Sequence, residues 1–180
     1  MTVAASEDAQ MTDSPDDGID WTGVDLEVAR HVCAQGETYL KAQQQSATAA
    51  DQRATTMASI LAVTSAALVA AAVNYATKVD GAALVAALFA TAACLLAGAM
   101  SAFWAARPVD FAFPGNSPES YYTCLNSDLA TVLGGEAENY NRHIEANNRL
   151  MGTNQWPVRI AMGLAVLAPL IGALVYLCGA

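Results

Sequence analysis

Charged side chains are scarce in this sequence, and basic ones are scarcest. Only 14% of the 180 residues are Asp, Glu, Lys or Arg, and eight basic residues stand against seventeen acidic ones. Nucleic-acid binding needs clustered Lys and Arg to neutralise phosphates, and no such cluster exists, so we expect no nucleic-acid partner. The four cysteines lack the paired spacing of a disulfide framework or a zinc site, and we expect no metal and no cofactor.

A catalytic constellation is also missing. His31 and His143 each stand alone at helical positions, and we interpret both as surface or partly buried side chains. The run Gly134-Gly135-Glu136 lacks the lysine and the Ser or Thr of a phosphate-binding loop. Because no nucleophile, base and orienting group can be assembled, we expect a protein that is not an enzyme.

What the sequence does have is three long stretches without Asp, Glu, Lys, Arg or His. They cover residues 54–77, 81–106 and 160–180. A bilayer core of roughly 30 Å is spanned by about 20 apolar residues in an α-helix, so each stretch is long enough. The alternative is a buried helical hairpin in a soluble protein, since alanine-rich stretches are less hydrophobic than leucine-rich ones. Without an ionisable side chain in any stretch, an ion-coupled transporter is disfavoured.

The basic residues predict the orientation. Seven lie before the first span or between the second and third: Arg30, Lys41, Arg53, Arg107, Arg142, Arg149 and Arg159. Only Lys78 lies in the short connection between the first two spans. Basic residues stay on the cytoplasmic side, so we expect a multi-pass protein of the cell inner membrane with a cytoplasmic amino terminus and a periplasmic carboxyl terminus.

These features predict an all-α integral membrane protein with three transmembrane helices and a cytoplasmic helical layer. Residues 1–22 form an acidic tail that we expect to be disordered. Residues 23–53 form a stalk helix, with Thr22 as a candidate N-cap, that runs on into the first span because residues 41–55 contain no Pro or Gly. Residues 54–106 form a transmembrane hairpin, residues 107–157 a cytoplasmic turn and helices, and residues 158–180 the third span.

Within the middle segment, Ser117 and Pro118 predict the start of a short helix. Ser127 or Asp128 caps a second helix, which we expect to be interrupted at Gly134-Gly135 and to resume before packing against the stalk. Pro169 predicts a kink in the third span.

Small residues recur at four-residue spacing on all three spans. The sets are Ala58, Ala62, Ala66 and Ala70; Ala82, Ala86, Ala90, Cys94 and Gly98; and Ala161 and Ala165. Such stripes allow helices to approach closely in lipid. They favour either a homo-oligomer or close packing of one protomer's own helices, because alanine is frequent enough here for chance stripes.

Several short motifs carry a resemblance to a known family. Ala50-Asp51-Gln52-Arg53-Ala54 opens the first span, Arg107-Pro108 follows the second, and Ser117-Pro118-Glu119-Ser120-Tyr121 opens a helix. This layout is similar to small bacterial Pycsar-type effectors and to the related SLATT group of membrane effectors. Arg53 stands where that family usually has lysine. The resemblance implies a nucleotide-triggered antiphage protein that damages the membrane.

Our leading hypothesis is therefore an oligomerising inner-membrane effector that responds to a cytoplasmic signal. The signal would be a cyclic nucleotide or a nucleotide-sensing protein. The candidate sensing residues combine a positive charge, aromatic rings and a turn: Arg107, Phe111, Phe113, Asn116, Tyr121 and Tyr122. Asp51 and Arg53 form a candidate pair at the membrane entry, facing another protomer or the helix around Arg149. The alternatives are a membrane scaffold that recruits a partner through its cytoplasmic helices, and a phage holin, which fits the span count but not the large cytoplasmic layer.

Overall fold

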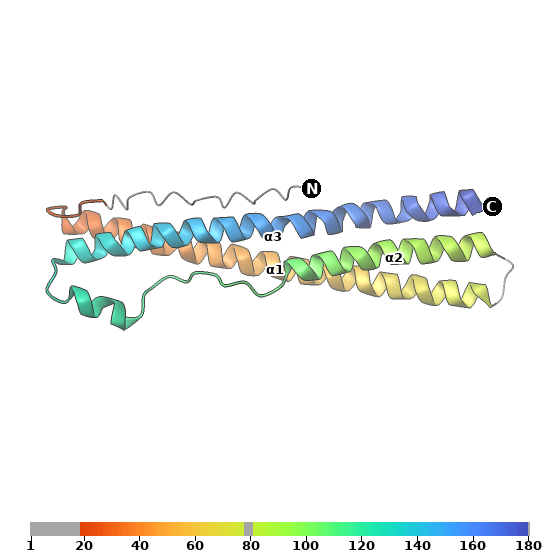
Figure 1. The fold of residues 1–180 in the computed structure, drawn as a ribbon, viewed down its shortest axis with the longest axis horizontal. Helices are drawn as coiled ribbons and strands as arrows, with labels where there is room; N and C mark the ends of the chain where they lie inside the picture. Colours follow the sequence, from red (N-terminus) through yellow and green to blue (C-terminus); the bar gives the residue numbers. More distant parts are fainter. Residues whose placement is uncertain (1–18, 78–80, 180) are drawn as a thin grey trace, which may run out of the picture.

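Three long helices run side by side along one axis in the computed structural model, which describes residues 19–77 and 81–179 (Figure 1). Helix α1 is Leu26–Ala76, α2 is Ala82–Ala105 and α3 is Leu129–Gly179, and the short 3-10 helix η1 is Pro118–Cys124. No strand occurs among these described residues, so the chain is all-helical there. At 1.5 Å per residue, α1 and α3 each extend over about 75 Å. The first eighteen residues of the expected tail and the connection at 78–80 lie outside the described residues.

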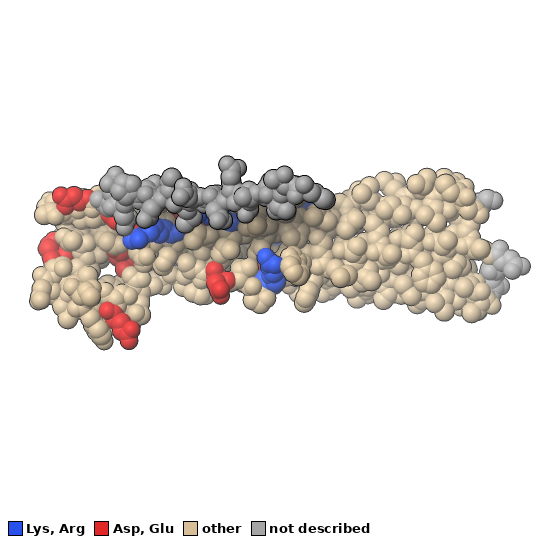
Figure 2. Space-filling view, viewed as in Figure 1, with Lys and Arg blue, Asp and Glu red and all other residues tan. Residues whose placement is uncertain are grey.

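The bundle has a polar half and an apolar half. The apolar half contains α2, residues 54–76 of α1 and residues 160–179 of α3, and its face in Figure 2 carries no charged side chain. The polar half contains the rest of α1 and α3, the connection at 106–117 and η1. All three long helices include a stretch long and apolar enough to cross a membrane. In the most apolar stretch of α1, α2 and α3, only 22%, 28% and 17% of the residues are buried.

The N-cap of helix α1 lies three residues later than expected. The Asp25 carboxylate accepts a hydrogen bond from the backbone N–H of Glu27 at 2.8 Å, so Asp25 is the N-cap. Thr22 instead donates its backbone N–H to Asp20 in the preceding turn. From Leu26 the helix continues without a break into the apolar half, which confirms the predicted continuity of stalk and first span.

Helix α3 also continues through both halves, and here one expectation is wrong. Gly134 and Gly135 lie inside the helix and do not interrupt it. Each glycine costs about 1 kcal/mol relative to alanine in a helix interior, a cost that packing can offset. Asp128 caps the helix by accepting from the backbone N–H of Ala130 at 3.1 Å, as one of the two candidates predicted. Pro157 and Pro169 both lie within its length.

The short helix begins at Pro118 as expected, although it is a 3-10 helix of seven residues. Ser117 does not cap it with its hydroxyl. The Ser117 carbonyl accepts the backbone N–H of Ser120 at 3.0 Å instead.

The buried side chains of α1 in the apolar half follow alternating spacings of four and three residues. Ala54, Ala58, Leu61, Ser65 and Ala72 are buried, and Leu68 packs against this core. Positions four apart rotate by about 40° per step around a helix, so an unbroken four-residue stripe leaves the packed face. Accordingly Ala62, Ala66 and Ala70 are exposed in the single chain, as are Ala82 and Ala86 on α2. Ala90 and Ala165 are half-buried, whereas Gly98 and Ala161 are buried.

Three polar contacts join the helices, two inside the apolar half and one, to Pro157, at its boundary. The Ser65 hydroxyl donates to the Ala92 carbonyl at 2.8 Å, and the Ser101 hydroxyl donates to the Pro157 carbonyl at 2.8 Å. The Cys94 thiol lies 3.4 Å from the Leu164 carbonyl. These bonds satisfy polar groups that lipid cannot.

Large apolar side chains point outward all around this half, among them Val63, Phe103, Val166 and Leu177 at 69–74% exposure. A soluble hairpin would bury such side chains against other protein. Their outward position fits a bilayer, and the chain has the form of a membrane protein.

Candidate functional site

In the polar half, the extended connection at 106–117 takes the place that α2 has in the apolar half. It leaves the end of α2 and continues in the same direction along α1 and α3 toward η1 (Figure 1). Its midpoint is fixed by Asn147 of α3, whose side chain is completely buried. The Asn147 Oδ1 accepts from the Ala112 N–H at 2.9 Å, and its Nδ2 donates to the Ala112 carbonyl at 3.0 Å. One side-chain amide thus satisfies both backbone groups of a residue that has no strand partner.

A second buried amide joins α1 to α3 at the same level. Gln43 Nε2 donates to the Ile144 carbonyl at 3.2 Å and to Asn148 Oδ1 at 2.9 Å. Gln43 Oε1 lies 3.4 Å from Asn147 Nδ2. These contacts confirm the prediction that the stalk packs against the helix preceding the third span. They also connect all three segments of the polar half through one set of amides.

Toward the far end of the polar half, Glu136 is a buried carboxyl group surrounded by polar side chains. Asn116 donates to Glu136 Oε2 at 2.5 Å and accepts from Asn139 at 2.8 Å. The pKa of Tyr121 and that of Tyr140 are raised, mainly by burial and to a smaller extent by the nearby Glu136 carboxylate. Burial and the same carboxylate raise the pKa of the Cys33 thiol. Asn116 and Asn139 thus join the end of the connection to the Glu136 carboxylate of α3 through side-chain hydrogen bonds.

The start of the described chain is attached to α3 by Trp21. Its indole N–H donates to Glu138 Oε1 at 2.8 Å, and the same oxygen accepts the Ile19 N–H at 2.9 Å. The ring covers Gly134, where a Cβ atom would overlap it. This contact explains why a glycine is accommodated inside the helix at position 134.

Where the polar half meets the apolar half, α1, α3 and the connection enclose a groove of about 580 Å³, which we call the junction groove. Phe111 and Phe113 of the connection line it together with Ala105, Val158 and Met162. Asp51 and Arg53 line it from α1, and Arg159 lines it from α3. The groove therefore combines an apolar wall with charged side chains.

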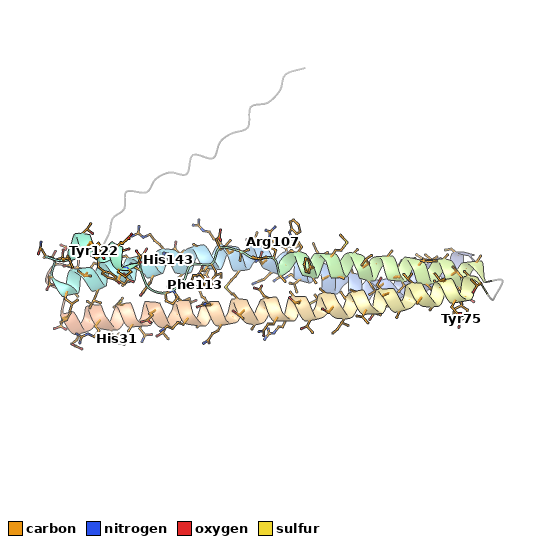
Figure 3. The ribbon with its side chains drawn as sticks, turned by 90° about the horizontal axis from the view of Figure 1, so that it is seen from below. His31, Tyr75, Arg107, Phe113, Tyr122 and His143 are labelled. Atoms are coloured by element: carbon orange, nitrogen blue, oxygen red, sulfur yellow. The ribbon has the colours of Figure 1, made fainter. Side chains whose placement is uncertain are left out.

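The six candidate sensing residues do not form one site. Phe111 and Phe113 lie in the junction groove, whereas Asn116 and Tyr121 lie beside Glu136 at a smaller pocket. The Arg107 guanidinium stacks over the Trp104 ring at 4.8 Å from its centroid, and Tyr122 is exposed. Arg107, Phe113 and Tyr122 are spread along the long axis in Figure 3. An extended segment separates residues that are close in sequence, which explains the spread.

Asp51 and Arg53, the candidate membrane-entry pair, form no ion pair with another described residue. The described residues contain two ion pairs, Arg30 with Glu27 and Lys41 with Glu37, each within α1. Asp51 and Arg53 are exposed and face the groove. In the described part of the chain, no three His, Cys, Asp or Glu side chains gather closely enough to hold a metal ion.

Sequence reasoning missed the structural roles of Asn147, Gln43 and Trp21. Gln43 and Asn147 each lie on an otherwise apolar helical face, and Trp21 lies just before the first helix. A buried partner for such a residue is a reasonable expectation, but its identity depends on the path of the connection. Comparisons with protein-family models, curated proteins and solved structures find no match to this chain.

Proposed function

We propose that this protein is an inner-membrane effector that oligomerises and impairs membrane integrity in response to a cytoplasmic signal in phage defence. The observation that carries the proposal is the continuity of α1 and α3, which each run unbroken from the polar half into the apolar half. A change in the packing of the polar half therefore moves two of the three spans directly. The resemblance to Pycsar-type and SLATT effectors supplies the biological setting.

The proposed orientation has the polar half and the amino terminus in the cytoplasm and the carboxyl terminus in the periplasm. Its support is the distribution of Lys and Arg, seven of which flank the spans on the polar-half side. Single-cysteine variants retaining Cys178, Cys33 or Cys124 provide the test. A membrane-impermeant thiol reagent added to intact cells should label Cys178 and leave Cys33 and Cys124 unlabelled until the cells are opened. The reverse pattern contradicts the orientation.

Oligomerisation is proposed because one protomer offers no polar path through the lipid. Its spans hold no Asp, Glu, Lys, Arg or His, and their few polar contacts join neighbouring helices. Ala62, Ala66 and Ala70 remain exposed on α1, where small side chains allow a second copy to approach. The substitution Ala66→Phe should reduce cross-linked oligomers, whereas Ala67→Phe, also at an exposed alanine, serves as the matched control.

The proposed signal acts on the amide contacts that connect α1, the connection and α3. A cyclic nucleotide is the ligand class that the resemblance favours, either bound directly or read by a partner protein. The test measures the membrane potential with a dye in cells that express the protein together with different nucleotide cyclases. Depolarisation with one cyclase, lost in the Ala66→Phe variant, supports the proposal. An unchanged potential with every cyclase contradicts it.

The second candidate is a membrane scaffold, favoured by apolar side chains at the far end of the polar half. Tyr122, Leu125 and Leu129 are 66%, 75% and 50% exposed around η1. Such a surface is suited to a protein partner. Capture of one protein partner, abolished by Tyr122→Ala with Leu125→Ala and accompanied by an unchanged membrane potential, would favour the scaffold.

A further inference from the structure

The junction groove lies at the boundary between charged and charge-free chain on every element that forms it. Arg53 is the last charged residue of α1 before its apolar stretch, and Arg159 is the last before the apolar stretch of α3. Ala105 ends α2, directly before the connection. In a membrane-embedded protein this boundary lies where lipid headgroups meet the hydrocarbon core.

The groove combines an apolar wall with two arginines at its membrane end. Ala54, Ala105 and Met162 give it an apolar wall on the side of the apolar half. Arg53 of α1 directly precedes Ala54, and Arg159 of α3 lies three residues before Met162. Neither arginine belongs to an ion pair among the described residues. Arg159 has one long contact, from Nη2 to Gln155 Oε1 at 3.4 Å. Most guanidinium N–H groups of both residues therefore remain available to an oxyanion.

We propose that the junction groove binds one anionic phospholipid of the bilayer. Its phosphate lies between Arg53 and Arg159, and an acyl chain lies along the wall toward Met162. Guanidinium groups bind phosphate oxygens through paired N–H donors. Asp51 contributes one negative charge, so the three charged lining groups sum to +1 and favour an anionic headgroup over a zwitterionic one. Residues 44–54 of α1, the connection and α3 would then be held together by a lipid.

A bilayer lipid suits this groove better than a soluble phosphate compound. The apolar wall continues the surface of the membrane-spanning half, where an acyl chain is already the surrounding medium. A soluble nucleotide would place its ribose against that wall. The proposal depends on membrane embedding but is independent of the effector function, since it concerns the resting protein.

Native mass spectrometry of the purified full-length protein, equilibrated with phosphatidylglycerol and phosphatidylcholine of equal chain length, tests the proposal. We expect one retained phosphatidylglycerol per protomer. The double variant Arg53→Gln with Arg159→Gln should weaken its binding by roughly thirtyfold, because each of the two basic residues near the headgroups contributes about 1 kcal/mol. The matched control, Arg142→Gln with Arg149→Gln, removes the same charge from the polar half outside the groove and should change binding less than twofold.

A second pair of variants changes volume without changing charge. Ala50→Trp places a large side chain at an exposed position that lines the groove, and Ala42→Trp places one at an exposed position that does not. Only Ala50→Trp should lower lipid retention. Asp51→Asn should increase retention of the anionic lipid. Equal retention by wild type, the arginine double variant and Ala50→Trp would overturn the proposal. Displacement of the lipid by inorganic phosphate or a cyclic nucleotide would also overturn it, and would identify a soluble ligand.

Discussion

The Asn147 side-chain amide hydrogen-bonds both backbone groups of one residue, Ala112. The oxygen accepts at 2.9 Å and the nitrogen donates at 3.0 Å, in a completely buried position. A single helical residue thereby determines the path of the extended connection between the second and third spans. The polar half depends on this pair because the connection has no regular backbone partner of its own.

Asn147→Ala should release the connection from α3. The change leaves the Ala112 N–H and carbonyl without partners, and a loss of about 2–4 kcal/mol is expected from two buried hydrogen bonds. Hydrogen exchange followed by mass spectrometry should show faster exchange in peptides covering residues 107–117. Asn141→Ala, at an exposed position on the same helix, is the control and should leave these peptides unchanged. Unaltered exchange in Asn147→Ala would contradict the assigned role.

Gly134→Ala should detach Trp21 from α3, because the added Cβ overlaps the indole ring. In a background with Trp104→Phe and Trp156→Phe, the fluorescence of Trp21 should shift to longer wavelength. The neighbouring Gly135→Ala meets no atom within 4 Å and should stabilise the helix by up to about 1 kcal/mol. Identical spectra for the two variants would show that Trp21 does not lie on Gly134.

Gly172→Ala tests the packing of α2 on α3 inside the apolar half. A Cβ at this position overlaps the Thr91 hydroxyl, whereas the Thr91 Cβ lies 3.5 Å away. We expect a loss of about 1–3 kcal/mol in detergent unfolding. Adding Thr91→Ala removes the overlapping oxygen and should recover most of the loss. Gly163→Ala, with open space around it, is the control. A double variant no more stable than Gly172→Ala would exclude this contact as the cause.

Alkaline pH should weaken the polar half through Tyr140. Burial and the Glu136 carboxylate raise the pKa of this phenol above its ordinary value of 10.0. Its contribution to stability is therefore fully present below pH 10 and is lost as the pH rises above it, because the unfolded chain ionises first. Tyr140→Phe should flatten the fall of the thermal midpoint between pH 9 and 11. Tyr39→Phe, at a 54% exposed position, should not. Equal slopes in both variants would contradict the assignment.

The sequence predicts the helices well because their signals are local. Charge-free stretches of 20 or more residues identify the three apolar helices, and the absence of Pro and Gly between residues 41 and 55 predicts the continuous α1. The N-cap at Asp25 was harder to predict because Thr22 is also a favoured cap residue. The uninterrupted α3 was harder to predict because Gly134-Gly135 favours a break in the helix. Gly134 is tolerated in α3 because Trp21, distant in sequence, packs on it.

The candidate site was less predictable for the same reason. Arg107, Phe113 and Tyr122 lie within one short stretch of sequence, but the extended chain places them at different levels of the bundle. The path of that extended chain is set by Asn147 and Glu136 of α3, which bind Ala112 and Asn116. The alanine stripes likewise follow a four-residue spacing in sequence, whereas packing selects alternating steps of three and four.

The central claim is that a signal received by the polar half opens the membrane through the apolar half. It is tested most directly with purified protein in vesicles that contain a self-quenched dye, in the presence of one cyclic nucleotide at a time. We predict dye release with the activating nucleotide and little release without it, with the response lost in Ala66→Phe and kept in Ala67→Phe. Vesicles that stay sealed with every nucleotide, or that leak equally in its absence and in both variants, would contradict the account.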